Sequence, residues 1–254
     1  MSKVIAIAKQ KGGVGKTTTA VNLSSCLAVK GKKVLIIDID PQGNTSSGLG
    51  IDKTSIDTSI YDVIINETPI NETFLKTKID NLLISPSNIQ LAGAEVELVS
   101  VISRETRLKH AIAPVKNDFD YIIIDCPPSL GLLTVNALTS ADTILVPIQC
   151  EYYALEGLSQ LMNTVKIVHK HLNPTLKVEG VVLTMFDART NLSIQVVEEV
   201  KKYFGNKVYR TIIPRNVRLS EAPSYGLPII LYDSKSKGAE CYMELAEEVI
   251  EYSD

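Results

Sequence analysis

A glycine-rich segment near the start of the chain has the residue types and spacing to bind the phosphates of a nucleotide. Residues 9–18 read Lys-Gln-Lys-Gly-Gly-Val-Gly-Lys-Thr-Thr and lie between an apolar run, 4–8, and a helix-like stretch, 19–28. A glycine-rich turn between a strand and a helix presents backbone N–H groups and the positive end of the helix dipole to an anion. Lys16 is then placed to reach the β- and γ-phosphates, and the Thr17 hydroxyl to bind Mg²⁺.

The loop departs from the usual G-x-x-x-x-G-K-[ST] spacing at one position. Gln10 stands where the pattern has its first glycine, and an additional lysine, Lys11, follows it. Lys11 lies too far before Lys16 to serve the same phosphates in the same way, so spacing alone shows only a surplus lysine. The alternative is a glycine-rich turn with two solvated lysines. The order of strand, loop, Lys-Thr and helix disfavours that alternative.

Acidic residues follow two other apolar runs. Asp38 and Asp40 come directly after residues 34–37, and Asp125 ends another run. Side chains alternate along a strand, so Asp38 and Asp40 are expected on one face, near the phosphate loop. Charge so close to a buried strand needs a partner, which Mg²⁺ and Lys16 would provide. For Asp38, capping of a helix or turn is an equal alternative to a direct role at the metal site.

These segments resemble the deviant Walker A ATPases, the group that contains ParA/Soj, MinD and the nitrogenase iron protein. The resemblance rests on the lysine-first loop, on Asp-Ile-Asp-Pro-Gln-Gly-Asn at 38–44 and on Ile-Ile-Ile-Asp-Cys-Pro-Pro-Ser at 122–129. Within the group, Gln-Cys-Glu-Tyr-Tyr-Ala-Leu-Glu-Gly at 149–157 and the run 213–223 point to the ParA/Soj branch. The match extends over nearly the whole chain.

The resemblance implies a Mg²⁺-dependent ATPase of chromosome or plasmid partitioning, which converts ATP and water to ADP and phosphate. It implies catalytic roles for Lys11, acting across a dimer interface, for Lys16, and for Asp40, which positions the attacking water. It implies that Thr17, Asp40 and Asp125 hold Mg²⁺, partly through water. The residues it implies for ATP binding are Lys11, Gly12, Gly13, Val14, Gly15, Lys16, Thr17, Thr18, Pro214 and Asn216.

In that list the last two residues would bind adenine. Pro214 would pack on the ring, and the Asn216 amide, with both a donor and an acceptor, suits the paired edge of the base. The alternative for Asn216 is a turn asparagine after proline.

The same resemblance implies that an ATP-bound sandwich homodimer binds double-stranded DNA without reading its sequence. Net charge is −3, yet residues 187–237 contain nine basic and five acidic residues, a local charge of +4. Local basic faces matter more than net charge for phosphate binding. The expected DNA contacts are Arg189, Arg218, Lys201 and Lys202; for the two lysines a solvated basic face is a real alternative. Other implied partners are a ParB/Spo0J-type centromere-binding protein and a replication initiator.

Strand-like runs alternate with helical stretches along the chain. This pattern predicts an α/β fold of the P-loop NTPase type, with a mostly parallel twisted β-sheet covered by helices on both faces. Helices are expected at 154–172 and 194–204, and short helices over the sheet edge at 51–78. We expect a single domain, 1–254. The predicted strands are Val4–Ala8, Val34–Asp38, Leu82–Ser85, Tyr121–Asp125, Thr143–Pro147, Glu179–Met185, Val208–Ile212 and Ile229–Leu231.

Composition is ordinary for a globular protein, with 45% hydrophobic and 22% charged residues among 254. No secretory n-region and no apolar run near ~18 residues are present, so we expect neither export nor a membrane span. The resemblance to ParA/Soj implies a cytoplasmic, nucleoid-associated protein with no membrane partner. The four cysteines lack close C-x-x-C spacing and are expected to be small core residues in a reducing cytosol.

Three other functions compete with DNA partitioning. A MinD-like membrane-associated positioning ATPase needs a basic amphipathic C-terminal helix, whereas 240–254 is amphipathic but acidic, and Leu245, Val249 and Ile250 are expected to dock on the core. An iron–sulfur reductase needs cysteines placed to share a cluster between subunits, and the cysteine spacing does not suggest this. Small-molecule phosphotransfer is compatible with the loop.

Overall fold

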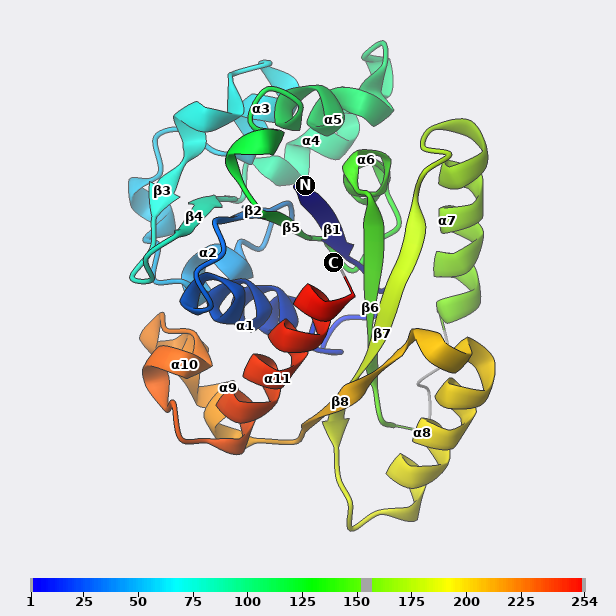
Figure 1. Ribbon diagram of the computed structural model, residues 1–254. Coiled ribbons are helices and arrows are strands. Elements are labelled where there is room, and N and C mark those ends of the chain that lie inside the picture. Colours follow the sequence, from blue (N-terminus) through cyan, green and yellow to red (C-terminus); the bar gives the residue numbers. More distant parts are fainter. Residues whose placement is uncertain (1, 152–156, 253–254) are drawn as a thin grey trace.

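One sheet organises the molecule (Figure 1). The computed structural model describes residues 2–151 and 157–252, and these form an eight-stranded sheet in the order β3-β4-β2-β5-β1-β6-β7-β8. All neighbouring strands run parallel except β3 and β4. The predicted α/β architecture is therefore confirmed.

The strands and helices have the following bounds. The strands are β1 (Lys3–Ile7), β2 (Val34–Asp38), β3 (Leu75–Lys76), β4 (Leu82–Ser85), β5 (Tyr121–Asp125), β6 (Thr143–Gln149), β7 (Lys177–Phe186) and β8 (Val208–Pro214). The α-helices are α1 (Lys16–Val29), α2 (Asn44–Gly48), α3 (Ile60–Ile65), α4 (Leu91–Glu97), α5 (Arg107–Ile112), α6 (Leu132–Ser140), α7 (Leu158–His171), α8 (Asn191–Phe204), α9 (Val217–Glu221), α10 (Ile229–Tyr232) and α11 (Lys237–Glu251). Short 3₁₀ turns include η1 (Lys53–Ser55), η2 (Ile70–Thr73) and η7 (Ala222–Tyr225).

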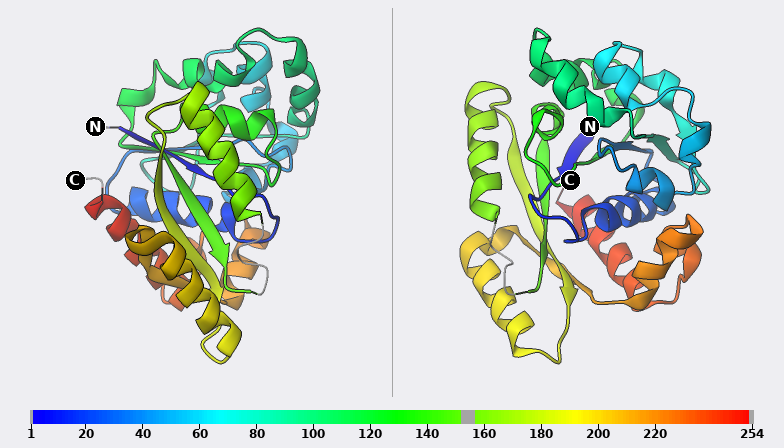
Figure 2. Two further views of the ribbon diagram at one scale, coloured as in Figure 1. Left: turned by 90° about the vertical axis from the view of Figure 1, so that its right-hand side faces the viewer. Right: turned by 180° about the vertical axis from the view of Figure 1, so that it is seen from behind.

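The strands are apolar throughout because both faces of the sheet are covered (Figure 2). On β1, Ile5 and Ile7 pack into a core shared with α1, α10 and α11, while Val4 and Ala6 pack into a second core shared with α3 to α8. Successive residues of a strand point to opposite faces, which explains this division. The sheet is thus a middle layer between two sets of helices.

Strand register brings three chain segments to the same place. Asp125 at the end of β5 pairs with Ile7 at the end of β1 on one side and with Asp38 at the end of β2 on the other. The chain leaving β1 becomes the glycine-rich loop. That loop therefore starts next to both acidic strand ends, as expected for ligand sites at the carboxyl edge of a parallel sheet.

One predicted strand is wrong. Residues Ile229–Leu231 form the short helix α10, not a strand. A brief apolar run does not distinguish a buried strand from a buried helical turn. Here Pro228 at the N-cap favours helix initiation, and the Ile229 N–H donates to the Asn22 side-chain oxygen at 2.7 Å instead of to a neighbouring strand.

The poorly patterned stretch 51–78 contains the expected short helices and one element that was not expected. It forms η1, α3 and η2, and then β3, a two-residue strand antiparallel to β4 at the sheet edge. Two residues are too few for a periodic signal. The predicted helix at 194–204 begins slightly earlier, at Asn191, and the first residues predicted for the helix at 154–172 lie partly outside the described range.

The C-terminal helix α11 docks on the sheet as predicted. Leu245 and Val249 are fully buried and Ile250 is partly buried against the α1 side of the core. Its exposed positions include Glu240, Glu244, Glu247 and Glu251. No helix in residues 2–151 and 157–252 is both long and apolar enough to cross a bilayer.

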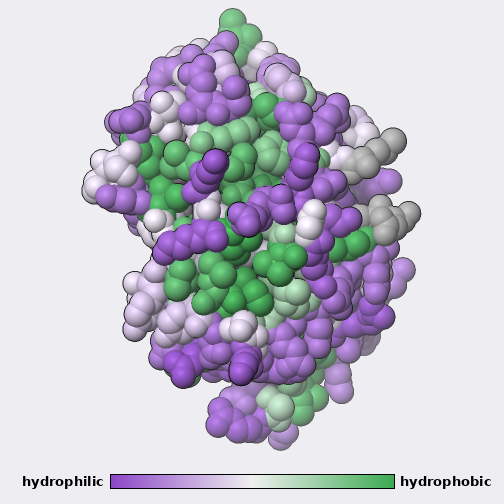
Figure 3. Space-filling model, turned by 60° about the vertical axis from the view of Figure 1, so that its left-hand side comes forward, coloured by the Kyte–Doolittle hydropathy of each residue, from purple (hydrophilic) through white to green (hydrophobic). Residues whose placement is uncertain are grey.

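The surface is not uniformly polar. Figure 3 shows hydrophobic residues in the middle of one side of the molecule, between bands of hydrophilic residues. Elsewhere, three large apolar side chains in and after α4 are exposed, namely Val96, Val99 and Ile102. Single exposed apolar residues are common in soluble proteins and by themselves indicate no function.

A buried glutamate closes the edge of the sheet at β8. Glu248 of α11 accepts hydrogen bonds from the backbone N–H groups of Arg210 and Thr211, at 2.8 and 2.7 Å, and from the Thr211 hydroxyl. Edge strands leave backbone groups without strand partners. Glu248 therefore supplies acceptors that a ninth strand would otherwise provide.

Glu248→Ala is expected to lower the free energy of unfolding by about 1–3 kcal/mol, because it leaves buried donors without acceptors. Urea unfolding followed by circular dichroism measures this. Glu247→Ala is the matched control: Glu247 is an exposed neighbour paired with Lys30, and its loss should change stability by less than about 1 kcal/mol. Equal effects of the two substitutions would contradict the edge-closing role.

Candidate nucleotide-binding site

The glycine-rich loop has the backbone conformation that its sequence predicts. Gly13 and Gly15 have φ of 75° and 88°, in the left-handed region that favours glycine. Helix α1 begins at Lys16, and its first intrahelical bond runs from Thr19 N–H to the Gly15 carbonyl at 2.9 Å. The Thr184 hydroxyl of β7 donates to the Val14 carbonyl at 2.9 Å and ties the loop to the sheet. The loop is thus held at the N-terminus of a 14-residue helix.

Lys16 lies inside the loop. Its ammonium donates to the Lys11 carbonyl at 2.9 Å, and the side chain is buried. Burial lowers the pKa of Lys16, while Asp125 and Asp40 counteract part of this effect. A cation beside the backbone N–H groups of a helix N-terminus is an arrangement that binds a phosphate.

Asp125 is the centre of the polar network. It is fully buried, and its Oδ2 accepts from the hydroxyls of Thr17 at 2.8 Å and Thr45 at 2.7 Å. Its Oδ1 is also buried but has no hydrogen-bond partner among the described residues. Burial raises the pKa of Asp125 to about 6. A carboxylate oxygen without a donor, beside a threonine hydroxyl, fits the oxygen ligands that Mg²⁺ prefers.

Asp38 has the geometry of a cap. It is fully buried, and its Oδ2 accepts from the Ser46 N–H at 2.9 Å and the Ser46 hydroxyl at 2.7 Å. Burial, followed by the nearby charge of Asp125, raises the pKa of Asp38 to about 7. Of the two alternatives from the sequence, the structure displays the capping of α2 directly.

Asp40 follows β2 and lies close to the other charges. It is nearly buried, and its Oδ1 accepts from the Gln42 N–H at 2.9 Å. The Asp40 N–H donates to Asp38 at 3.2 Å. Asp40 lies close enough to Lys16 and Asp125 for its charge to affect the pKa of both groups.

A cavity of about 360 Å³ adjoins the loop on the side of β8. It is lined by Gly15 and Thr18 from the loop and by both residues predicted to bind adenine, Pro214 and Asn216. The Asn216 oxygen also caps α9, accepting from the Arg218 N–H at 2.9 Å. Asn216 is thus a cap as well as a cavity residue, and a base edge would share its oxygen with that bond.

Lys9 is a site residue that the sequence reasoning missed. Only 1% of it is exposed, and it lines a cavity of about 740 Å³ together with Lys11, Glu151 and Arg215. Burial lowers the pKa of Lys9 to about 8, with a further contribution from the charge of Lys11. Lys9 lies two residues beyond the end of β1, and a lysine at the start of a loop carries no sequence signal that it will be enclosed. Lys11, partly exposed, lines this cavity and not the one beside β8.

The predicted DNA contacts lie in three places, with Arg189 in the turn before α8, Lys201 and Lys202 near the end of α8, and Arg218 in α9. Arg189 and Arg218 lie three and four residues beyond the ends of β7 and β8, where Phe186 and Pro214 pair. Yet α8 and α9 pack on opposite faces of the sheet (Figure 2), and Lys201 and Lys202 are exposed at the far end of α8. The structure therefore does not gather the four side chains into a single patch within one subunit.

Both arginines have acidic neighbours. Arg189 is 86% exposed and donates to Asp187 at 2.8 and 2.7 Å. Hydrogen bonds from Arg189 lower the pKa of Asp187 to about 2. Arg218 pairs with Glu221 at 3.0 Å and with Asp233 at 3.4 Å. A phosphate would have to compete with these carboxylates.

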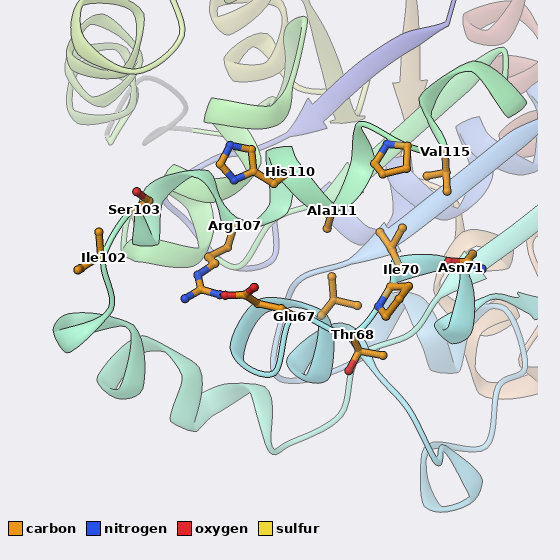
Figure 4. Close-up of a pocket in the computed structure, with 13 residues that line it drawn as sticks. Glu67, Thr68, Ile70, Asn71, Ile102, Ser103, Arg107, His110, Ala111 and Val115 are labelled. Atoms are coloured by element: carbon orange, nitrogen blue, oxygen red, sulfur yellow. The ribbon is translucent and has the colours of Figure 1, made fainter.

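A further cavity, of about 530 Å³, lies between α3 and α5 (Figure 4). Glu67 and Arg107 form an ion pair at its rim, and His110 and Asn71 also line it. It contains no residue of the predicted site. The charges of its one ion pair compensate each other, and nothing in it resembles a phosphate loop.

The four cysteines match the sequence prediction. Cys26, Cys126, Cys150 and Cys241 are buried and free. Burial raises the pKa of the Cys126 thiol above its ordinary range. Among the described residues, no three His, Cys, Asp or Glu side chains gather to hold a metal ion.

Comparison with known proteins identifies the family of the chain. The sequence model of a family described as an AAA domain matches residues 2–178. The chain is 65% identical over 249 residues to the sporulation initiation inhibitor protein Soj of Bacillus subtilis, covering 98% of each protein, and 56% identical over 250 residues to the chromosome partitioning protein ParA of Myxococcus xanthus, covering 98% of this chain and 88% of that protein.

A solved structure has the same fold. Cobyrinic acid a,c-diamide synthase of Mycobacterium smegmatis, with a bound ATP analogue and magnesium, superimposes with a TM-score of 0.88 at 37% identity, covering 100% of this chain and 96% of that one. The parallel sheet and the loop after β1 define a P-loop nucleoside triphosphatase. At the level of sequence, the chain belongs to the ParA/Soj family of chromosome-partitioning ATPases.

The burial of Lys9 predicts how the stability of the protein changes with pH. Folding lowers the pKa of Lys9 from 10.5 to about 8, so between these values the folded state binds fewer protons than the unfolded state. Stability contributed by this group therefore rises with pH across that window. Relative to that of Lys9→Met, the free energy of unfolding of the wild type should rise by on the order of 1 kcal/mol per pH unit. Urea unfolding at pH 7.5 and 9.5 measures it; a constant difference between the two proteins contradicts the burial argument.

Proposed function

We propose that the site binds ATP with Mg²⁺, its phosphates enclosed by Gly12 to Thr18 and its adenine in the cavity lined by Pro214 and Asn216. Lys16 and the N-terminus of α1 supply the positive charge. Thr17 and Asp125 hold the metal ion, with Asp40 contributing through water. The observation that carries this assignment is Asp125 Oδ1, which has no hydrogen-bond partner within residues 2–151 and 157–252.

Hydrolysis follows from positioning more than from covalent chemistry. Mg²⁺, which Thr17 and Asp125 would hold, would neutralise charge that develops on the phosphoryl group. Asp40, whose carboxylate already accepts from Gln42 N–H, orients the attacking water. Lys16 stabilises charge on the transferred group.

Two copies are proposed to join face to face around two nucleotides, with Lys11 reaching the nucleotide of the partner. Two observations support this arrangement. Lys11 lies in a different cavity from the one assigned to adenine. A side-chain carbon at Gly12 would meet nothing within 4 Å in one subunit, so space in front of the loop is available to a second copy.

Dimer formation is proposed to control binding to double-stranded DNA. Arg189 and Arg218 lie at the same end of neighbouring strands, and a dimer doubles their number. Their ion pairs with Asp187 and Glu221 are exposed, and exposed pairs contribute little, so phosphates can replace them. Each retained phosphate contact steepens the salt dependence by about 0.9 log units per log of salt.

Partners follow from the family. We infer a ParB/Spo0J-type centromere-binding protein that stimulates hydrolysis, a replication initiator as a further partner, and a location on the nucleoid. A MinD-like membrane function is disfavoured because the exposed side of α11 is acidic. Small-molecule chemistry is disfavoured by 65% identity to Soj against 37% to the diamide synthase.

DNA binding with ATP, ADP or no nucleotide, measured by interferometry at two salt concentrations, tests this function. We expect salt-sensitive binding with ATP alone. Arg189→Glu should weaken it at least about tenfold, since it removes a phosphate contact and adds repulsion in each subunit.

Lys109→Glu is the charge-matched control. Lys109 is an exposed lysine on α5, at the opposite end of the molecule from α8 (Figure 1). The Lys109→Glu protein should therefore bind DNA with the same affinity as the wild type. Nucleotide-independent DNA binding, or equal weakening by both substitutions, would refute the proposed DNA face.

A further inference from the structure

The short helix α2 supplies side chains to both buried carboxylates of the site. The Thr45 hydroxyl donates to Asp125 Oδ2 at 2.7 Å, and the Ser46 hydroxyl donates to Asp38 Oδ2 at 2.7 Å. Thr45 and Ser46 are both fully buried. Neither belongs to the glycine-rich loop, and the chemistry described above uses neither of them.

We propose that Thr45 is a positioning residue for magnesium: it fixes the orientation of the Asp125 carboxylate and thereby sets the affinity of the site for the metal ion. This inference rests on the proposed nucleotide site. Thr45 itself does not touch the metal or the reacting atoms.

The two oxygens of the Asp125 carboxylate have different hydrogen bonding, and this difference supports the role of Thr45. Asp125 Oδ2 accepts from two hydroxyls, those of Thr17 and Thr45, whereas Oδ1 has no donor in the described part of the chain. Thr17 is also the proposed metal ligand, so its oxygen has two tasks. Thr45 has one task, the hydrogen bond to Asp125 Oδ2. A carboxylate held on one oxygen keeps the other available.

Thr45 is itself held by a turn that has little freedom. Gly43, at the N-cap of α2, has φ of 61°, and a side-chain carbon there would lie 2.9 Å from the Ser87 carbonyl oxygen. The Ser87 N–H donates to the Ser46 hydroxyl at 3.1 Å. Ser46 in turn donates to Asp38. The turn thus presents Thr45 from a fixed backbone, which is a requirement for orienting another group.

The other side of α2 is also packed. Gly50, just beyond α2, lies against Gly226, so closely that a side-chain carbon on Gly50 would be 2.8 Å from the Gly226 carbonyl oxygen. Gly226 ends η7. Because α2 is confined on both sides, loss of the Thr45 hydroxyl is expected to free Asp125 and not to displace the helix.

Magnesium dependence distinguishes positioning from a merely structural role. Calorimetry would measure binding of a non-hydrolysable ATP analogue at graded MgCl₂ concentrations and in EDTA. Thr45→Val should raise the Mg²⁺ concentration for half-maximal enhancement by about 10–100-fold, the usual effect of losing an outer-shell partner. Binding in EDTA should stay within about twofold of the wild type.

Three variants complete the test. Thr45→Ser keeps the hydroxyl and should restore wild-type magnesium dependence. Thr45→Ala should reproduce the shift if Thr45→Val fails to fold. Thr139→Val is the matched control, because Thr139 is a buried threonine on α6 whose hydroxyl has no hydrogen-bond partner among the described residues.

Wild-type magnesium dependence in a folded Thr45→Val or Thr45→Ala protein overturns the inference. So does an equal shift in Thr45→Ser, which would assign the effect to the methyl group. A wild type that binds the analogue equally well with Mg²⁺ and with EDTA overturns the magnesium site as well as the role of Thr45, and the two failures are therefore distinguishable.

Discussion

Buried charge at the carboxyl edge of the sheet is the constraint on which the rest of the structure depends. Asp38 and Asp125 are fully buried side by side at paired strand ends, with Lys16 and Lys9 enclosed nearby. Burying such groups is costly unless each is paired or hydrogen-bonded. Burial raises the pKa of both aspartates and lowers the pKa of both lysines, and these shifts reflect that cost.

Much of the surrounding fold serves to compensate these charges. Helix α2 contributes two hydroxyl donors, because Thr45 donates to Asp125 and Ser46 donates to Asp38. The loop is fixed to β7 through Thr184 so that Lys16 stays inside it. In the described part of the chain, Asp125 Oδ1 has no hydrogen-bond partner. Under the proposed function, Mg²⁺ bound with a triphosphate would compensate this carboxylate, so that ligand binding would also complete the charge pairing of the buried site.

The sequence predicted the sheet and the phosphate loop because both have strong local signals. Continuous β-branched runs mark strands buried on both faces, and Lys16 and Thr17 have a fixed relation to the glycines. It did not predict Thr45, Ser46 or Lys9, whose roles depend on contacts between distant segments. The helix at Ile229–Tyr232 was mistaken for a strand because four apolar residues have no measurable period. The sequence also did not show that Arg189 and Arg218 adjoin helices on opposite faces of the sheet, because this depends on how the chain continues after β7 and β8.

Thermal unfolding with MgCl₂, an ATP analogue, both or neither tests the central claim most directly. The account predicts a large rise in Tm only with both together, roughly 5–10 °C at about 100 times the Kd. The rise should disappear in Lys16→Ala and persist in Lys33→Ala, which changes an exposed lysine. An unchanged Tm in the wild type with both ligands would contradict the claim that they complete the buried charge cluster.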